Sequence, residues 1–220
     1  MKVGTDGVLL GAWTNPANAE RILDIGTGTG LIALMLAQKC DAVIDAIDID
    51  ENSCSQASEN VLASQWNDRV KVHHCSLQLY ILMSSVKYDL IVSNPPYFID
   101  AYKAHDRSRN LARQADTALS FDELILGVKA TMKEDGRFCV ILPCKEGSYF
   151  KSKAAVAGLY CNRITHVKTR SDRHEKRVIM EFSFHKETLV ENELIIHDEE
   201  LKFTEHYKSL TRDFYPAFSQ

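Results

Sequence analysis

Short apolar runs that suit β-strands alternate with longer segments that suit helices over most of this sequence. The run Arg21–Ile25 is followed by closely spaced glycines and then by residues 31–37, whose composition favours a helix. Strands separated by helices predict a mainly parallel, doubly wound sheet with helices on both faces. The last two runs are joined by a short charged segment and can pair as an antiparallel hairpin. The expected strands cover residues 21–25, 42–47, 69–74, 88–92, 137–142, 161–169 and 177–184, and the expected helices cover residues 31–37, 51–63, 120–132, 147–157 and part of 203–215.

Size and composition favour one soluble domain over residues 1–220. The chain is 220 residues long and 45% hydrophobic, which is enough to fill a single sizeable core. No apolar run approaches the roughly 20 residues that a membrane helix requires, and the first residues lack the apolar core of a signal peptide. The six cysteines and eight histidines show no metal-ligand spacing. We therefore expect a cytoplasmic protein with free thiols, no metal and no membrane partner.

The glycine-rich loop predicts a site for a nucleoside or an amino-acid carboxylate. Glycines at positions 26, 28 and 30 let the backbone turn sharply and let a ligand approach main-chain N–H groups at the start of a helix. Their G-x-G-x-G spacing departs from the G-x-G-x-x-G fingerprint, which disfavours NAD or FAD. Asp48 follows the second expected strand, where its carboxylate can accept hydrogen bonds from ribose hydroxyls, with Ile49 beside the adenine ring. The alternative is that Asp50 caps the next helix and Asp48 is merely exposed.

The run Asn94-Pro95-Pro96-Tyr97 directly follows the fourth expected strand. An aryl amino nitrogen is a poor nucleophile, because its lone pair is delocalised into the ring. The side-chain oxygen of Asn94 and the carbonyl of Pro95 can each accept one N–H and turn that lone pair toward an incoming methyl group. Tyr97 can stack on a flat base. The alternative is a simple turn, since Asn-Pro and Pro-Pro commonly end strands.

Three segments together resemble the bacterial tRNA adenine N6-methyltransferase family, nearly end to end. They are MKVGTDGVLLGAW at 1–13, LDIGTGTGL at 23–31 and DLIVSNPPYF at 89–98, and residues 207–215 resemble the family's ending. The resemblance implies a Rossmann-like class I methyltransferase fold, with a seven-stranded sheet that has one antiparallel strand. It also implies S-adenosylmethionine as cofactor and, as substrate, the adenine 3′ of the anticodon in a valine tRNA, position 37. The chain would then comprise an N-terminal segment (1–20), a cofactor-binding half with the Asn-Pro-Pro-Tyr run (21–97) and a substrate-side half (98–220).

Family roles carry over to individual positions of this sequence. Catalytic roles are implied for Asn94, Pro95, Pro96 and Tyr97. Many relatives have an acid after the third strand, where this chain has Ser76, whose hydroxyl can still bond the adenine amino group, although less strongly than a carboxylate. The implied cofactor contacts are Thr5, Asp6, Asp24, Gly26, Thr27, Gly28, Gly30, Asp48, Ile49, Ser76, Leu77 and Asn94.

Basic side chains occur in two clusters that can contact RNA phosphates, although charged loops are often only solvated. The net charge of −4 argues against a protein that coats nucleic acid indiscriminately, yet residues 163–177 carry six Lys and Arg side chains against two acids. The candidate RNA contacts are Lys103, Arg107, Arg109, Arg113, Lys168, Arg170, Arg173, Lys176 and Arg177. No obligate protein partner is evident from the sequence.

Three other functions remain open at this stage. A protein glutamine N5-methyltransferase acting on a translation factor uses the same Asn-Pro-Pro-Tyr device, but such enzymes carry an N-terminal helical domain, and only about 20 residues precede the first strand here. A DNA adenine methyltransferase usually has an added target-recognition region. A non-catalytic module that binds the cofactor or RNA would share the glycine loop without the reaction.

Overall fold

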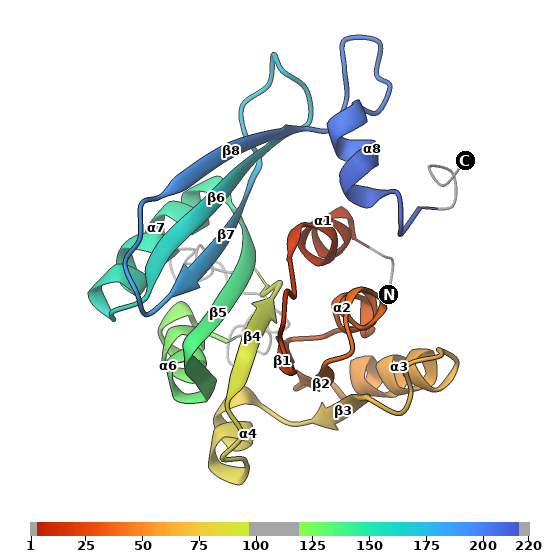
Figure 1. Cartoon of the computed structure of the whole chain (residues 1–220), viewed down its shortest axis with the longest axis vertical. Coiled ribbons are helices and arrows are strands. Elements are labelled where there is room, and N and C mark those ends of the chain that lie inside the picture. Colours follow the sequence, from red (N-terminus) through yellow and green to blue (C-terminus); the bar gives the residue numbers. More distant parts are fainter. Residues whose placement is uncertain (1–3, 97–118, 216–220) are drawn as a thin grey trace, which may run out of the picture.

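The computed structural model describes residues 4–96 and 119–215. They form an eight-stranded sheet with the strand order β3-β2-β1-β4-β5-β7-β6-β8 (Figure 1). β1 to β5 are mutually parallel, β7 runs antiparallel to both of its neighbours, and β8 is parallel to β6. The strands are β1 (Arg21–Ile25), β2 (Val43–Asp48), β3 (Val70–His74), β4 (Tyr88–Ser93), β5 (Met132–Pro143), β6 (Tyr160–Lys168), β7 (Arg177–Ser183) and β8 (Val190–Ile195).

Helices cover both faces of the sheet, as expected (Figure 1). Ile22 and Leu90 point to the face packed by α1, α2, α3 and α8, whereas their neighbours Leu23 and Ile91 point to the face packed by α4, α6 and α7. Both faces are apolar because a parallel sheet is buried on both sides. The helices are α1 (Thr5–Trp13), α2 (Leu31–Lys39), α3 (Glu51–Leu62), α4 (Leu77–Met83), α6 (Phe121–Thr131), α7 (Cys144–Val156) and α8 (Glu205–Thr211).

The strand count is one higher than the seven expected, because β8 extends the sheet beyond β6. This edge strand is mostly exposed. Its two acids, Glu191 and Glu193, face solvent, and only Leu194 is buried within its span. Charges on an edge strand discourage pairing with other chains, and they also hide the strand from a search for apolar runs. The expectation of a single antiparallel strand is confirmed by β7.

Most predicted boundaries agree with the structure to within a few residues. The expected cap at Ser120 is confirmed, since its hydroxyl accepts the Glu123 N–H at 3.2 Å and its own N–H donates to the Glu123 carboxylate at 2.8 Å. The fifth strand begins earlier than predicted, at Met132, which pairs with Tyr88 before residues 133–136 bulge out of the ladder. The residues of this bulge favour a turn, so the sequence does not reveal that the strand begins at Met132.

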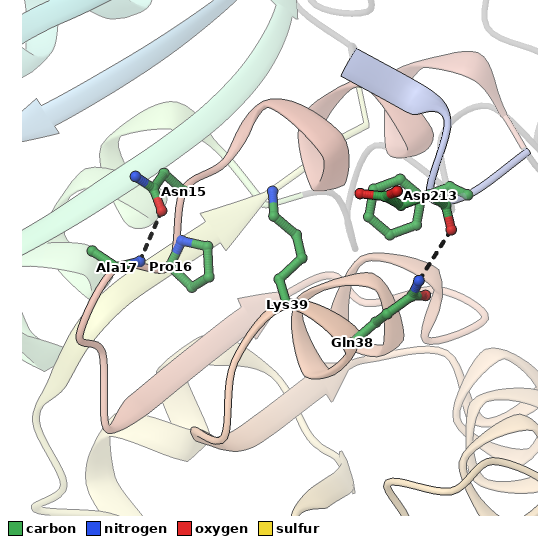
Figure 2. A pocket seen from close by; sticks show the side chains of 7 residues that line it. Asn15, Pro16, Ala17, Gln38, Lys39 and Asp213 are labelled. Atoms are coloured by element: carbon green, nitrogen blue, oxygen red, sulfur yellow. Dashed lines mark hydrogen bonds between the residues drawn. The ribbon is translucent and has the colours of Figure 1, made fainter. Parts of the chain in front are cut away.

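The helix α1 was not predicted, because its glycines lower its helix propensity. They are explained by packing: a Cβ on Gly11 would lie 2.7 Å from the Met35 sulfur, so the backbones of α1 and α2 can approach closely only with glycine at this position. Lys39, at the end of α2, extends toward the last turn of α1 (Figure 2) and donates to the carbonyls of Gly11, Ala12 and Thr14. A cation there complements the negative end of the helix dipole.

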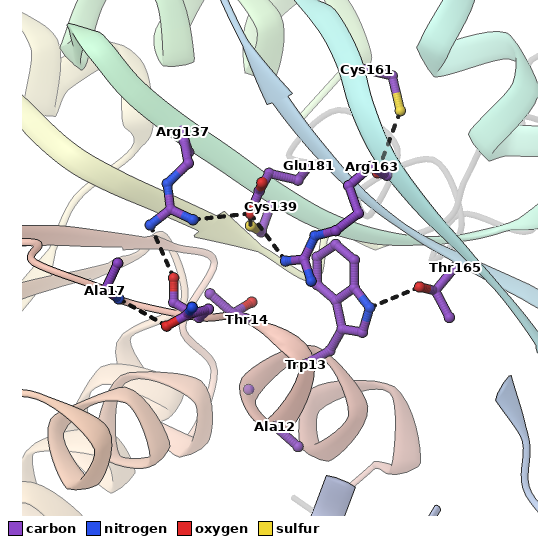
Figure 3. Close-up of polar contacts among 12 residues, drawn as sticks. Ala12, Trp13, Thr14, Ala17, Arg137, Cys139, Cys161, Arg163, Thr165 and Glu181 are labelled. Carbon is purple, nitrogen blue, oxygen red and sulfur yellow. Dashed lines mark hydrogen bonds and ion pairs between the residues drawn. The ribbon is translucent and has the colours of Figure 1, made fainter. Parts of the chain in front are cut away.

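A cluster of charged side chains fastens α1 to the antiparallel end of the sheet (Figure 3). Glu181 on β7 accepts from Arg137 at 3.2 Å and from Arg163 at 3.1 Å. The Arg163 guanidinium lies 3.5 Å from the centre of the Trp13 ring, and the Trp13 indole N–H donates to Thr165 at 2.8 Å. One carboxylate therefore holds two guanidiniums, of which one stacks on the last residue of α1.

Replacing Glu181 by glutamine should lower the free energy of unfolding by about 2 kcal/mol, because two partly buried guanidiniums lose their shared counter-charge. Urea unfolding of the two proteins measures this difference. Glu191→Gln is the matched control: its side chain is 59% exposed and its nearest cation, His166, is 3.8 Å away. We expect a change below about 0.5 kcal/mol for the control. Equal effects of the two substitutions would contradict the structural role of Glu181.

Candidate active site

The glycine loop joins the carboxyl end of β1 to the start of α2 and is held by the end of β2. The N–H groups of Gly26 and Thr27 both donate to the carbonyl of Ile47, at 2.9 and 3.0 Å. Gly28 has a φ of 57° and Gly30 a φ of 80°, both in the left-handed region that glycine adopts without strain. A Cβ on Gly28 would meet no atom of the described residues within 4 Å, so this part of the loop presents an open side to a ligand.

Asp24 is a fully buried carboxylate beneath this loop. One oxygen accepts the Thr27 hydroxyl at 2.6 Å, whereas the other makes no hydrogen bond within the described ranges. Burial raises the pKa of Asp24 from 3.8 to about 7, and the hydrogen bond from Thr27 and the nearby Ala33 main chain only partly oppose this shift. A cationic or N–H-bearing ligand group at this point would supply the missing partner.

Asp48 ends β2 and is bonded by main-chain donors at both oxygens. Its carboxylate accepts the Gly28 N–H at 2.8 Å and the Asp50 N–H at 2.9 Å. Asp50 does cap α3, by accepting the Ser53 N–H at 2.8 Å, so that part of the alternative reading is correct. Asp48, however, is half-buried rather than merely exposed, and it ties the end of β2 to the glycine loop. Its remaining lone pairs can accept ribose hydroxyls, and Ile49 is 51% exposed beside it.

The residues after β3 form the next boundary of the site. The Cys75 N–H donates to the Asp48 carbonyl at 2.9 Å, which places this loop directly beside the end of β2. Ser76 caps α4 by accepting the Leu79 N–H at 3.2 Å, and its hydroxyl hydrogen is still able to donate to a ligand. The Leu77 side chain is buried against Gly127 of α6, so only its main chain is suited to touch a ligand.

Asn94 and Pro95 follow β4 next to the glycine loop. Ile25 pairs with Ser93 in the parallel β1–β4 ladder, and the Ser93 hydroxyl donates to the Ile25 carbonyl at 2.9 Å. Asn94 is half-buried and Pro95 is buried. The order of the strands reverses between β1 and β4, and this switch point is where open α/β sheets bind ligands. Sequence reasoning missed Ser93, since a hydroxyl inside an apolar strand carries no local signal of its distant partner.

The N-terminal candidates lie in the first turn of α1. Gly7 packs on Leu31, the first residue of α2. The contact is close, since a Cβ on Gly7 would lie 3.2 Å from the Leu31 side chain. The first turn therefore lies near the end of the glycine loop. Thr5 is exposed there, and the Asp6 carboxylate accepts from the Arg177 Nε at 2.7 Å.

The candidate RNA contacts differ in their surroundings. Lys168 is paired with Glu193, and Arg170 lies 3.1 Å from Asp172. Arg173 has a 65% exposed side chain, and Lys176 is also exposed. Four RNA candidates lie outside the described residues, namely Lys103, Arg107, Arg109 and Arg113, and so does the catalytic candidate Tyr97.

A separate cavity of about 360 Å³ lies at the other end of α2 (Figure 2). It is lined by residues 15–17, by Gln38 and Lys39, and by Asp213 and Phe214. The glycine loop precedes α2, so the length of this helix separates the cavity from the site. Within residues 4–96 and 119–215, no three His, Cys, Asp or Glu side chains are arranged to hold a metal ion. No helix in the same ranges is long and apolar enough to cross a membrane.

Comparisons with known proteins agree with this geometry. Residues 4–138 match the Methyltransferase small domain family. Among solved structures, a predicted O-methyltransferase from Agrobacterium tumefaciens superposes with a TM-score of 0.73 at 17% identity, covering 94% of this chain and 96% of that one. A TehB-like SAM-dependent methyltransferase from Corynebacterium glutamicum gives a TM-score of 0.52 at 17% identity, covering 81% and 86%. The expected class I methyltransferase fold is therefore confirmed.

Curated relatives are much closer in sequence. The tRNA1(Val) (adenine(37)-N6)-methyltransferase of Bacteroides fragilis is 45% identical over 216 residues, which is 98% of this chain and 91% of that protein. The enzyme of the same name from Trichodesmium erythraeum is 47% identical over 218 residues, with the same coverage. With such identity over nearly its whole length, the chain belongs to the tRNA1(Val) (adenine(37)-N6)-methyltransferase family.

Proposed function

We propose that this protein transfers a methyl group from S-adenosylmethionine to the exocyclic N6 of an adenine in tRNA, at position 37 of a valine tRNA. The observation that carries the proposal is the meeting of three loops at neighbouring strand ends: the glycine loop after β1, Asp48 after β2 and Asn94-Pro95 after β4. Relatives that share this chain's sequence nearly end to end are named for that reaction. We place the activity in the cytoplasm, where tRNA is modified.

The cofactor fits the groups that this chain presents. The open side of the glycine loop leaves room for the methionine part, and the unsatisfied oxygen of Asp24 suits its ammonium group. Asp48 would accept the ribose hydroxyls, with Ile49 and Ser76 at the adenine ring. S-adenosylmethionine supplies an activated methyl group on a sulfonium, so the protein needs no strong general base.

The chain's own part in the reaction is to orient the adenine amino group. The Asn94 side-chain oxygen and the Pro95 carbonyl would each accept one of its N–H groups, which turns the nitrogen lone pair toward the methyl donor. The Ser93 hydroxyl fixes this loop by bonding the end of β1. Tyr97 would stack on the base. Exposed cations of the hairpin, Arg173 and Lys176, would contact phosphates, together with Lys103, Arg107, Arg109, Arg113, Lys168 and Arg170.

Asn94→Ala should lower kcat about 100-fold while leaving the Kd for S-adenosylmethionine within about twofold, since a single preorganised polar contact in a transition state is worth that much. Transfer of labelled methyl groups to bulk tRNA measures kcat, and calorimetry measures Kd. Asn192→Ala, on the exposed edge strand β8, is the control and should keep full activity. Labelling of bulk protein in place of tRNA would favour the glutamine methyltransferase, and unchanged tRNA methylation by the Asn94 variant would refute the proposed role.

Gly28→Ala and Gly158→Ala form a matched pair. Both glycines have a positive φ, 57° and 81°, and a Cβ on either would meet no atom within 4 Å in the part of the chain that the structure describes. Each substitution should therefore lower stability by about 1 kcal/mol through backbone strain alone. Only Gly28→Ala should also weaken S-adenosylmethionine binding, by about tenfold or more, because its methyl group projects toward the ligand side of the loop. Equal ligand affinity of the two variants would contradict this placement.

Binding of S-adenosylmethionine at pH 6 should release close to one proton, because Asp24 with a pKa of about 7 must ionise to pair with the ammonium group. Calorimetry in two buffers of different ionisation enthalpy counts the protons. In Asp24→Asn the release should disappear. Relative to Asp24→Asn, the ligand-free protein should also lose stability as pH rises from about 4 to 7, since the unfolded chain gives up the Asp24 proton first. Equal proton release by both proteins would rule out Asp24 as the partner.

A further inference from the structure

The helix α1 lies between the glycine-loop side of the sheet and its antiparallel end. On the first side, Gly7 and Gly11 let α1 pack tightly on α2, which starts directly after the loop. On the second side, its last residue, Trp13, is held by Thr165 and by the Arg163 guanidinium, both on β6. The last turn of α1 is therefore fixed to the sheet at several points.

The first turn of α1 is joined to the hairpin by an ion pair. Arg177 is the first residue of β7 and follows the hairpin tip, residues 169–176, whose base is closed by the Lys176 N–H donating to the Val167 carbonyl at 2.9 Å. The Arg177 Nε donates to Asp6 at 2.7 Å. The two side chains are only 31% and 23% exposed, so solvent screens this pair less than an ordinary surface pair.

Arg177 and Lys176 are adjacent in sequence but differ in what their side chains do. The Arg177 guanidinium is engaged at Nε by Asp6 and at Nη1 by the Lys176 carbonyl at 3.0 Å, while the Lys176 side chain is exposed. A fork-shaped guanidinium that bonds a carboxylate and a carbonyl at once fixes the relative position of the two segments. From the sequence alone, both residues are candidate phosphate contacts, whereas in the structure only the Lys176 side chain is exposed.

We infer that Arg177 is a positioning residue: through Asp6 it holds the first turn of α1, with Thr5, in place at the amino-acid end of the cofactor site. This inference rests on the proposed function, which assigns Thr5 and Asp6 to that end of S-adenosylmethionine. The hairpin would then act on both ligands. The exposed cations at its tip would contact RNA, and Arg177 at its base would support the cofactor site.

Arg177→Gln should raise the Kd and KM for S-adenosylmethionine about tenfold, with kcat at saturating cofactor within about twofold, because the first turn loses its anchor but the reacting groups are unchanged. Lys176→Gln, the matched neighbour, should leave the cofactor Kd unchanged and lower the slope of tRNA affinity against salt by about one. Asp6→Asn should weaken cofactor binding as well. In the Asp6→Asn background, adding Arg177→Gln should have no further effect.

Three results would overturn the inference: an unchanged cofactor Kd in Arg177→Gln, full additivity of the two substitutions, or a lower salt slope for tRNA in Arg177→Gln. If Arg177→Gln fails to fold, Arg177→Lys replaces it in the test, since lysine keeps the charge without the fork. The cofactor Kd of Arg177→Lys should then be intermediate, and in the Asp6→Asn background this substitution should have no further effect on Kd. Cofactor binding is measured by calorimetry without tRNA. A protein that shows these effects but methylates no tRNA would therefore disprove the proposed function and leave the inference standing.

Discussion

The parallel pairing of β1 with both β2 and β4 is the constraint on which the site depends. Ile25 pairs with Ile47 on one side and with Ser93 on the other, so the loops after three strands begin at the same level. The register is strongly fixed, because a slip by one residue would exchange the faces to which Leu23 and its neighbours point. The register of the strands therefore brings the glycine loop, Asp48 and Asn94 to one edge of the sheet, and the bond from the Gly28 N–H to Asp48 then ties the loop to the end of β2.

Local chemistry explains which parts of the fold could be predicted. Apolar runs bounded by polar segments identified the inner strands, and the Ser120 capping box identified the start of α6. By contrast, α1 was missed because Gly7 and Gly11 weaken a helix locally and are justified only by packing on α2. β8 was missed because only one residue within its span is buried. In both cases the deciding interaction is with a segment distant in the sequence.

The same distinction separates the parts of the candidate site. The loop glycines and Asp48 were found because their roles follow from backbone geometry within one strand-loop-helix unit. The bond from Ser93 to Ile25 spans 68 residues and the pair of Arg177 with Asp6 spans 171, so neither has a local pattern. A sequence shows that a side chain is charged but not which partner it has, so the pairing of Arg177 with Asp6 is visible only in the structure.

A half-buried acid, Glu181, and a fully buried one, Asp24, show how stability and function divide within this fold. Glu181 is satisfied by two guanidiniums, so its charge is compensated within the folded chain and strengthens the sheet. Asp24 is more deeply buried and has only the Thr27 hydroxyl as a side-chain donor, so its pKa rises and its ionised form is costly. A carboxylate left in this state beneath an open glycine loop lowers the stability of the empty protein and favours a cationic ligand. A cationic ligand would relieve the unfavourable burial of the ionised Asp24, and this relief would add to the free energy of binding.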